Sequence, residues 1–380
     1  MNFELNDEQR ALQASLRRVL GDRYGFDKRR ALAASALGHD EETWHALGDL
    51  GIMALTVPEA QGGFGGGACD LLPVMQELGE VLSLEPLLSC VLGARAIERV
   101  ADSPIQTQLL TGVAEGRVRL AWAHDESVGR HLPCWVEARA RRQANAWVLD
   151  GEKSCVVGGG LAHHLVITAR VAGAADDPLG RALFLVDREA VGLERRDFRL
   201  VDDSSASQFR LHGVSAMALG DPADHARAGA AIDGALGIGV AATCADMVGT
   251  MQVAFRLAMD YLNTRKQFGR LIGENQALRH RAAEMLVSLE LAKSMAIAAA
   301  IAADRSADTQ SQCDLHRAKL SVGRHARSLL HSAIQIHGGI GMTEEYQVGH
   351  CLRRIHVMDQ LFGDGEAHAT RLAGLPLQVS

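Results

Sequence analysis

The stretch Arg265-Lys266-Gln267-Phe268-Gly269 interrupts an alanine-rich sequence that otherwise has the apolar spacing of helices. A basic last turn followed by glycine is typical of a helix that ends and turns. The apolar spacing on either side predicts helix-length segments near 226–264, 275–304, 311–338 and 344–358. Four long helices in succession favour a bundle.

Upstream of this bundle the pattern changes twice. Between about 118 and 221, short apolar runs such as 165–168 and 182–186 are bounded by turn residues, which is typical of strands. From 7 to about 112 the apolar residues again have helical spacing. The sequence therefore predicts a mainly α chain with a small β middle domain. Its expected domains are a helical domain at 1–117, a β domain at 118–224 and a helical bundle at 225–380.

Composition excludes several classes of protein. The formal net charge is -7 and no block of five or six like charges occurs, which argues against a nucleic-acid-binding surface. The 7 cysteines lack any C-x-x-C pair, so we expect neither a disulfide framework nor a metal site, and a reducing cytoplasm fits. No targeting segment is visible, and the longest apolar run, Met295–Ala303, falls short of a membrane span.

Further segments accompany the first one along the chain. They are Val148–Lys153, Asn275-Gln276 and Gln335-Ile336-His337-Gly338-Gly339-Ile340-Gly341. As a set, these segments resemble the acyl-CoA dehydrogenase family, whose members have an N-terminal helical domain, a β-barrel-like middle domain and a C-terminal four-helix bundle. Leu361-Phe362-Gly363-Asp364 and the unusual middle domain are most similar to the small-subunit branch represented by pimeloyl-CoA dehydrogenase.

The resemblance implies an FAD site shared between subunits. In the family these segments contact FAD that is bound mainly by the neighbouring subunit, which implies a dimer or larger, such as a tetramer. An arginine offers a planar cation for a pyrophosphate, and glycines let the backbone approach a flat ring. We expect His337 to be a packing or capping residue. The implied cofactor-binding residues are Arg265, Gln267, Phe268, Gly269, Gln276, Gln335, Gly338 and Gly339.

The resemblance also implies a reaction that needs a base. The family removes a proton α to the thioester carbonyl of an acyl-CoA and passes a hydride to FAD, with an electron-transfer flavoprotein-type acceptor downstream. Most members place a glutamate directly before a glycine near the C-terminus. Counting without gaps from Gln335 puts Phe362 there, whereas a two-residue gap brings Asp364 before Gly365, so Asp364 is the candidate catalytic base. Asp246, on the first bundle helix, is expected to be a structural partner.

The middle domain departs from the family pattern. His124-Asp125-Glu126 replaces the usual Thr-Glu-Pro, and Cys155-Val156-Val157 replaces Trp-Ile-Thr at the flavin edge. The segments for a neighbour's FAD thus persist while those for the chain's own flavin do not. Three interpretations stay open: an acyl-CoA dehydrogenase of fatty or dicarboxylic acid degradation, a non-catalytic supporting subunit of an α2β2 acyl-CoA dehydrogenase, and a flavin oxidase-type relative.

Overall fold

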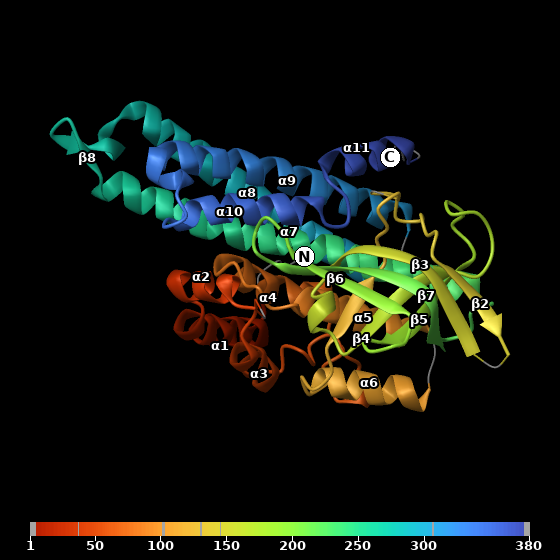
Figure 1. The fold of residues 1–380 in the computed structure, drawn as a ribbon. Coiled ribbons are helices and arrows are strands. Elements are labelled where there is room, and N and C mark those ends of the chain that lie inside the picture. Colours follow the sequence, from red (N-terminus) through yellow and green to blue (C-terminus); the bar gives the residue numbers. More distant parts are fainter. Residues whose placement is uncertain are drawn as a thin grey trace. The chain divides into compact units, whose positions relative to one another are not determined.

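A computed structural model describes residues 5–36, 38–100, 103–129, 131–144, 146–305 and 308–375. Helices come first, strands follow, and long helices complete the chain, so the mainly α class with a small β region is confirmed (Figure 1). The first helices are α1 (Asp7–Arg23), α2 (Phe26–Ala34), α3 (Glu41–Asp49), α4 (Ala68–Glu80), α5 (Leu87–Val100) and α6 (Pro104–Ala114).

The strands of the middle region are β1 (Leu120–Ala123), β2 (Arg139–Gln143), β3 (Ala146–Val157), β4 (His164–Arg170), β5 (Arg181–Asp187), β6 (Leu193–Arg199) and β7 (Ser205–Leu219). They pair in the order β1-β4-β2-β3-β7-β5, and β5 also pairs with β4, which closes the sheet on itself. Strand β6 pairs with β7 outside this path. The apolar runs at 165–168 and 182–186 fall within β4 and β5, as predicted, because residues such as Ile167 and Phe184 fill the barrel core.

Arg170, the last residue of β4, is buried within this β region. Its guanidinium donates hydrogen bonds to backbone carbonyls from two loops. The acceptors are the carbonyls of Cys134, Val136, Ala172, Ala175, Asp177 and Leu179. A buried cation needs such partners because an unpaired one carries a large desolvation cost.

The C-terminal part contains α7 (His225–Thr264), α8 (Gln276–Asp304), α9 (Thr309–His337), α10 (Gln347–Gln360) and α11 (Gly365–Gly374). Helix α4 approaches α7 closely because glycines face both backbones. A Cβ added to Gly249 would lie 1.9 Å from the Gln76 carbonyl oxygen, and one added to Gly79 would lie 2.2 Å from the Asp246 carbonyl oxygen. The Asp246 carboxylate pairs with Arg354, with both side chains buried and Nη2–Oδ2 at 2.6 Å, so its expected structural role is confirmed.

Two compact units group these elements by packing. One contains 1–30, 71–83 and 240–380, and the other contains 31–70 and 84–239. The change from helix to strand falls between α6 and β1, and the change back falls between β7 and α7. The domain boundaries at 117 and 224 remain predictions, since the units do not follow that change.

Helices α7 and α8 are long and apolar enough to cross a membrane by length and composition. Neither helix is a single uninterrupted apolar run in the sequence. The apolar window of α7 is 78% buried inside the fold, as in a core helix, and that of α8 is 39% buried. Core helices of bundles commonly have this length and hydropathy, so these two properties are weak evidence for a membrane span.

Candidate functional site

The sequence-predicted cofactor residues begin where α7 ends. Arg265 follows the helix, and a short hairpin of β8 (Lys266–Gln267) and β9 (Arg270–Leu271) extends from the end of the bundle (Figure 1). Phe268 and Gly269 form its tip with left-handed φ values of 52° and 78°. The Phe268 side chain is completely exposed, and Arg265 and Gln267 are exposed as well. An aromatic ring and a cation are therefore available to a molecule outside the chain.

Gln276 is the first residue of α8 and is exposed directly after this hairpin. The intervening turn is held by the Arg270 guanidinium, which donates to the Asn275 side-chain oxygen at 2.8 Å. Asn275 in turn donates its side-chain amide to the Ile272 carbonyl at 3.0 Å. Gln276 thus continues the polar surface of the hairpin.

The second group of predicted residues lies where α9 ends. Gln335 is exposed on its last turn, and Gly338 adopts φ 65° and ψ -141°, a conformation that disfavours other residues. Gly339 has no positive φ, yet it too is exposed. A Cβ added to Gly269, Gly338 or Gly339 would meet no atom within 4 Å. Packing within this chain therefore does not require glycine at 339.

The structure brings these two groups together at one end of the bundle. Tyr261, one turn before Arg265, packs against His337, the residue before Gly338, with 4.7 Å between ring centroids. The residues gathered there include exposed cations, side-chain amides and open glycines. This set fits a dinucleotide, because arginine binds phosphate through paired donors and the glycines leave the backbone accessible.

Asp364 lies away from this group, beyond the 14 residues of α10, which span about 21 Å. It is the N-cap of α11, and its Oδ1 accepts a hydrogen bond from the Ala367 amide at 2.9 Å. Phe362 and Gly363 before it have left-handed φ values of 63° and 106°. The carboxylate therefore has a structural role, and its role as a base stays a prediction.

A pair of histidines supports this turn. The His368 Nε2 is 3.2 Å from the Phe362 carbonyl oxygen, and its Nδ1 is 2.9 Å from Nδ1 of His316. Burial lowers the pKa of His368 to about 2 and that of His316 to about 4, so both rings are neutral at pH 7. If one of the two neutral rings carries its hydrogen on Nδ1 and the other does not, the first Nδ1 donates a hydrogen bond to the second.

Lys319 is a buried cation that motif reading missed. Its Nζ donates to the Thr243 hydroxyl at 2.9 Å and also to the Met358 carbonyl. Burial lowers the pKa of Lys319, and nearby acidic groups, Asp364 among them, oppose this effect. A signal existed in the sequence, since Lys319 lies on the same helical stripe as Val322 and Ala326, which are buried.

The β region holds another buried cation besides Arg170. Lys153 is fully buried, and its Nζ donates to Glu126 Oε1 at 2.6 Å, to the His124 carbonyl at 3.0 Å and to the Thr168 hydroxyl at 3.1 Å. Burial lowers the pKa of His124 to about 3 and raises that of Asp125 to about 6. Both shifts favour the neutral forms of His124 and Asp125 beside the Lys153–Glu126 ion pair.

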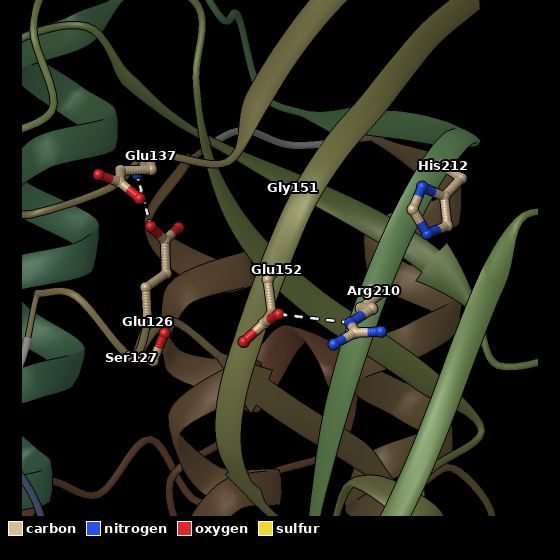
Figure 2. Close-up of a pocket in the computed structure, with 7 residues that line it drawn as sticks. All are labelled: Glu126, Ser127, Glu137, Gly151, Glu152, Arg210 and His212. Carbon is tan, nitrogen blue, oxygen red and sulfur yellow. Dashed lines mark hydrogen bonds and ion pairs between the residues drawn. The ribbon is translucent and has the colours of Figure 1, made fainter.

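A cavity of about 370 Å³ lies on the same β region (Figure 2). Its lining residues are Glu126, Ser127, Glu137, Gly151, Glu152, Arg210 and His212. Figure 2 shows that Glu152 faces Arg210, to which it pairs at 3.5 Å. Of the lining glutamates, Glu126 pairs with Lys153 and Glu152 pairs with Arg210. Cys155 on β3 is no candidate nucleophile, because burial raises its pKa to about 11.

Comparison with known proteins places this fold in a class of flavoproteins. Residues 6–117 match the acyl-CoA dehydrogenase N-terminal domain, and residues 229–374 match the acyl-CoA dehydrogenase C-terminal domain. The chain therefore belongs to the acyl-CoA dehydrogenase family, whose cofactor is FAD.

Known relatives and solved structures are similar to this chain over nearly its whole length. Acyl-CoA dehydrogenase FadE12 of Mycobacterium tuberculosis is 28% identical over 358 residues, 91% of this chain and 90% of that protein. A variant of the steroid ACAD Tcur3481-Tcur3483 is 28% identical with a TM-score of 0.85, covering 97% of both chains. The ChsE4-ChsE5 complex of Mycobacterium tuberculosis has a TM-score of 0.87 at 22% identity, covering 99% of this chain and 100% of that one.

Proposed function

We propose that this chain is a subunit of an FAD-dependent acyl-CoA dehydrogenase, which converts an acyl-CoA thioester to the trans-2-enoyl-CoA. Family membership supports the reaction class. One observation supports the cofactor: Gly339 is exposed, and no atom of the described chain lies within 4 Å of a Cβ added to it. An open glycine beside an exposed hairpin suits a flat ligand from outside the chain.

This end of the bundle would hold part of an FAD that belongs to a neighbouring subunit. Arg265 would pair with the pyrophosphate, Gln276 and Gln335 would donate amide hydrogen bonds, and Phe268 would cover an apolar face. Bound FAD supplies the acceptor for the substrate hydride. The reduced flavin would pass electrons to an electron-transfer flavoprotein-type partner.

Proton removal is the step that this chain must supply if it is catalytic by itself. Asp364 is the residue proposed for it, although its carboxylate caps α11. A cap bond to a backbone amide stabilises the ionised form and reduces basicity. Phe362, at the position without gaps, has no proton-accepting side chain.

The same observations favour a second candidate function, a supporting subunit of a hetero-oligomer. In that assembly the open end of the bundle completes the FAD site of a sister subunit, which carries the base. The sequence Cys155-Val156-Val157 supports this, because it stands where the family has Trp-Ile-Thr at the edge of the chain's own flavin. The ChsE4-ChsE5 complex shows the fold in a complex of two named components.

The visible spectrum of the purified chain, with flavin quantified per subunit after denaturation, distinguishes these functions. One FAD per subunit that bleaches with an acyl-CoA supports the self-sufficient dehydrogenase. A colourless chain that acquires flavin only when co-expressed with a homologue containing the Glu-Gly motif supports the supporting subunit. Hydrogen peroxide formed under air would instead indicate the oxidase-type relative. A chain that takes up no flavin in any assembly contradicts the proposal.

Asp364→Asn then tests the base without removing the cap, because asparagine caps helices as well as aspartate does. If Asp364 is the base, turnover falls by about 10²–10⁴ while FAD content stays constant. Asp308→Asn is the matched control, since Asp308 caps α9 through a 2.7 Å bond from the Ser311 amide. Unchanged turnover in Asp364→Asn would exclude this residue as the base.

A further inference from the structure

His337 is the centre of an aromatic cluster, the His337 cluster, which consists of His337, Tyr261 and Tyr346. The ring centroid of His337 lies 4.7 Å from that of Tyr261 at an interplanar angle of 36°. It lies 4.8 Å from the ring centroid of Tyr346 at an interplanar angle of 49°. His337 is buried, whereas the two tyrosines are half-buried. The three rings come from the last turns of α7 and α9 and from the N-cap of α10.

Both ring nitrogens of His337 have partners, which defines its tautomer. Nδ1 lies 2.7 Å from the Ala333 carbonyl oxygen, and a carbonyl only accepts, so Nδ1 carries the hydrogen. Nε2 is then the acceptor for the Tyr346 hydroxyl at 3.1 Å. Burial lowers the pKa of His337, and the backbone carbonyls of Ala333 and Leu257 oppose this effect. The ring is therefore neutral at pH 7 and fixed in one orientation.

Each residue of the His337 cluster is linked through the backbone to the Arg265 hairpin or to the loop that begins at Gly338. The Tyr261 carbonyl accepts a 2.9 Å hydrogen bond from the backbone amide of Arg265, where the hairpin begins. His337 directly precedes Gly338, and Tyr346 ends the loop that Gly338 starts. A shift of the His337 ring would thus change the separation between Arg265 and the glycines. Binding sites lose affinity when their groups move by about half an ångström.

We propose that the His337 cluster is a positioning device that holds the Arg265 hairpin and the Gly338-Gly339 loop in the arrangement that one dinucleotide needs. The inference rests on the proposed binding of FAD at this end and assigns that site three residues beyond those implied by the family resemblance. None of the three is proposed to contact the cofactor; they act through Arg265 and Gly338.

The test uses the flavin-loaded oligomer, homo- or hetero-, and measures FAD release after dilution by the rise in flavin fluorescence. Tyr346→Phe removes one hydroxyl and keeps the ring, so folding is retained while FAD affinity falls about fivefold, the equivalent of one hydrogen bond. His337→Phe removes both side-chain hydrogen bonds and is expected to lower affinity further. His356→Phe, an exposed histidine on α10, is the control and leaves FAD release unchanged.

A double-mutant cycle separates positioning from general stabilisation. If the cluster positions Arg265, Arg265→Gln costs less affinity in the Tyr346→Phe background than in the wild type, by threefold or more. If the cluster only stabilises the fold, thermal stability falls and the two effects on FAD release multiply independently, which overturns the inference. A wild-type oligomer that binds no FAD overturns the proposed function as well, whereas unchanged release from both variants overturns the positioning role alone.

Discussion

Replacing Gly339 by alanine separates folding from cofactor binding. The added Cβ meets no atom within 4 Å, and the backbone at 339 is not left-handed. The folded chain therefore gains no strain, and alanine restricts the unfolded chain, so the free energy of unfolding is expected to rise by up to about 1 kcal/mol. A methyl group placed against a bound flat ring has the opposite effect, because overpacking costs about 1–3 kcal/mol. FAD affinity should fall by roughly 5- to 150-fold.

Two assays on the same preparation test this prediction: thermal unfolding of the protein and FAD release from the oligomer. Gly338→Ala is a contrasting variant, because its φ of 65° strains alanine by about 1–3 kcal/mol and lowers stability as well as affinity. Gly21→Ala, in the exposed face of α1, is the matched control: its Cβ also meets no described atom within 4 Å, so stability should rise similarly while FAD release stays unchanged. Wild-type FAD release from Gly339→Ala would refute the placement of the cofactor at this glycine.

Three further predictions concern stability. Lowering the pH from 7 to 5 should destabilise the fold by about 4 kcal/mol, because the unfolded chain protonates His124, His316 and His368 below about 6.5 while the folded chain, with pKa values of about 3, 4 and 2, does not. Each of these histidines destabilises the fold by about 2 kcal/mol at pH 5. Asp125, whose pKa is raised to about 6, stabilises it by about 1.4 kcal/mol below that pH. Urea midpoints that are equal at both pH values would contradict this prediction. Lys153→Met should cost about 3–5 kcal/mol in urea unfolding, because it leaves a buried carboxylate without its cation, and a loss below 1 kcal/mol would show that the pair is hydrated. Asp364→Ala should cost about 1 kcal/mol in thermal unfolding by removing the α11 cap, whereas Asn retains it; equal stability of both variants would show that the cap contributes nothing.

Helix positions in the bundle were predictable from sequence to within three residues, the largest difference being at α10, which begins at Gln347 where 344 was expected. The segment predicted at 275–304 is α8 at Gln276–Asp304, and the one predicted at 311–338 is α9 at Thr309–His337. Long helices with a continuous apolar stripe carry many consistent signals, and a glycine, Gly338, directly follows the last residue of α9. The short hairpin between α7 and α8 was not predicted as strands, because two-residue strands carry no periodicity.

The candidate site was predictable only where its residues are consecutive. Motif spacing identified the exposed ends of α7 and α9. For His337 it predicted only packing or capping and not the partners Tyr261 and Tyr346, which are distant in sequence. The His316–His368 pair joins residues 52 apart in sequence, and no local pattern reports such a contact. Asp364 was selected by its register before a glycine, although an aspartate that directly precedes a helix is also a capping signal.

Arg170 limits how the loops around it can change during evolution or engineering. Six carbonyl groups from residues 134–136 and 172–179 point at one guanidinium, so the protein backbone replaces the water shell of this ion. Lysine has only three donors on a single nitrogen and would leave several of these carbonyls unsatisfied. An insertion or deletion in either loop would therefore disturb the other loop through the shared cation, and the two loops are expected to vary in length together or not at all.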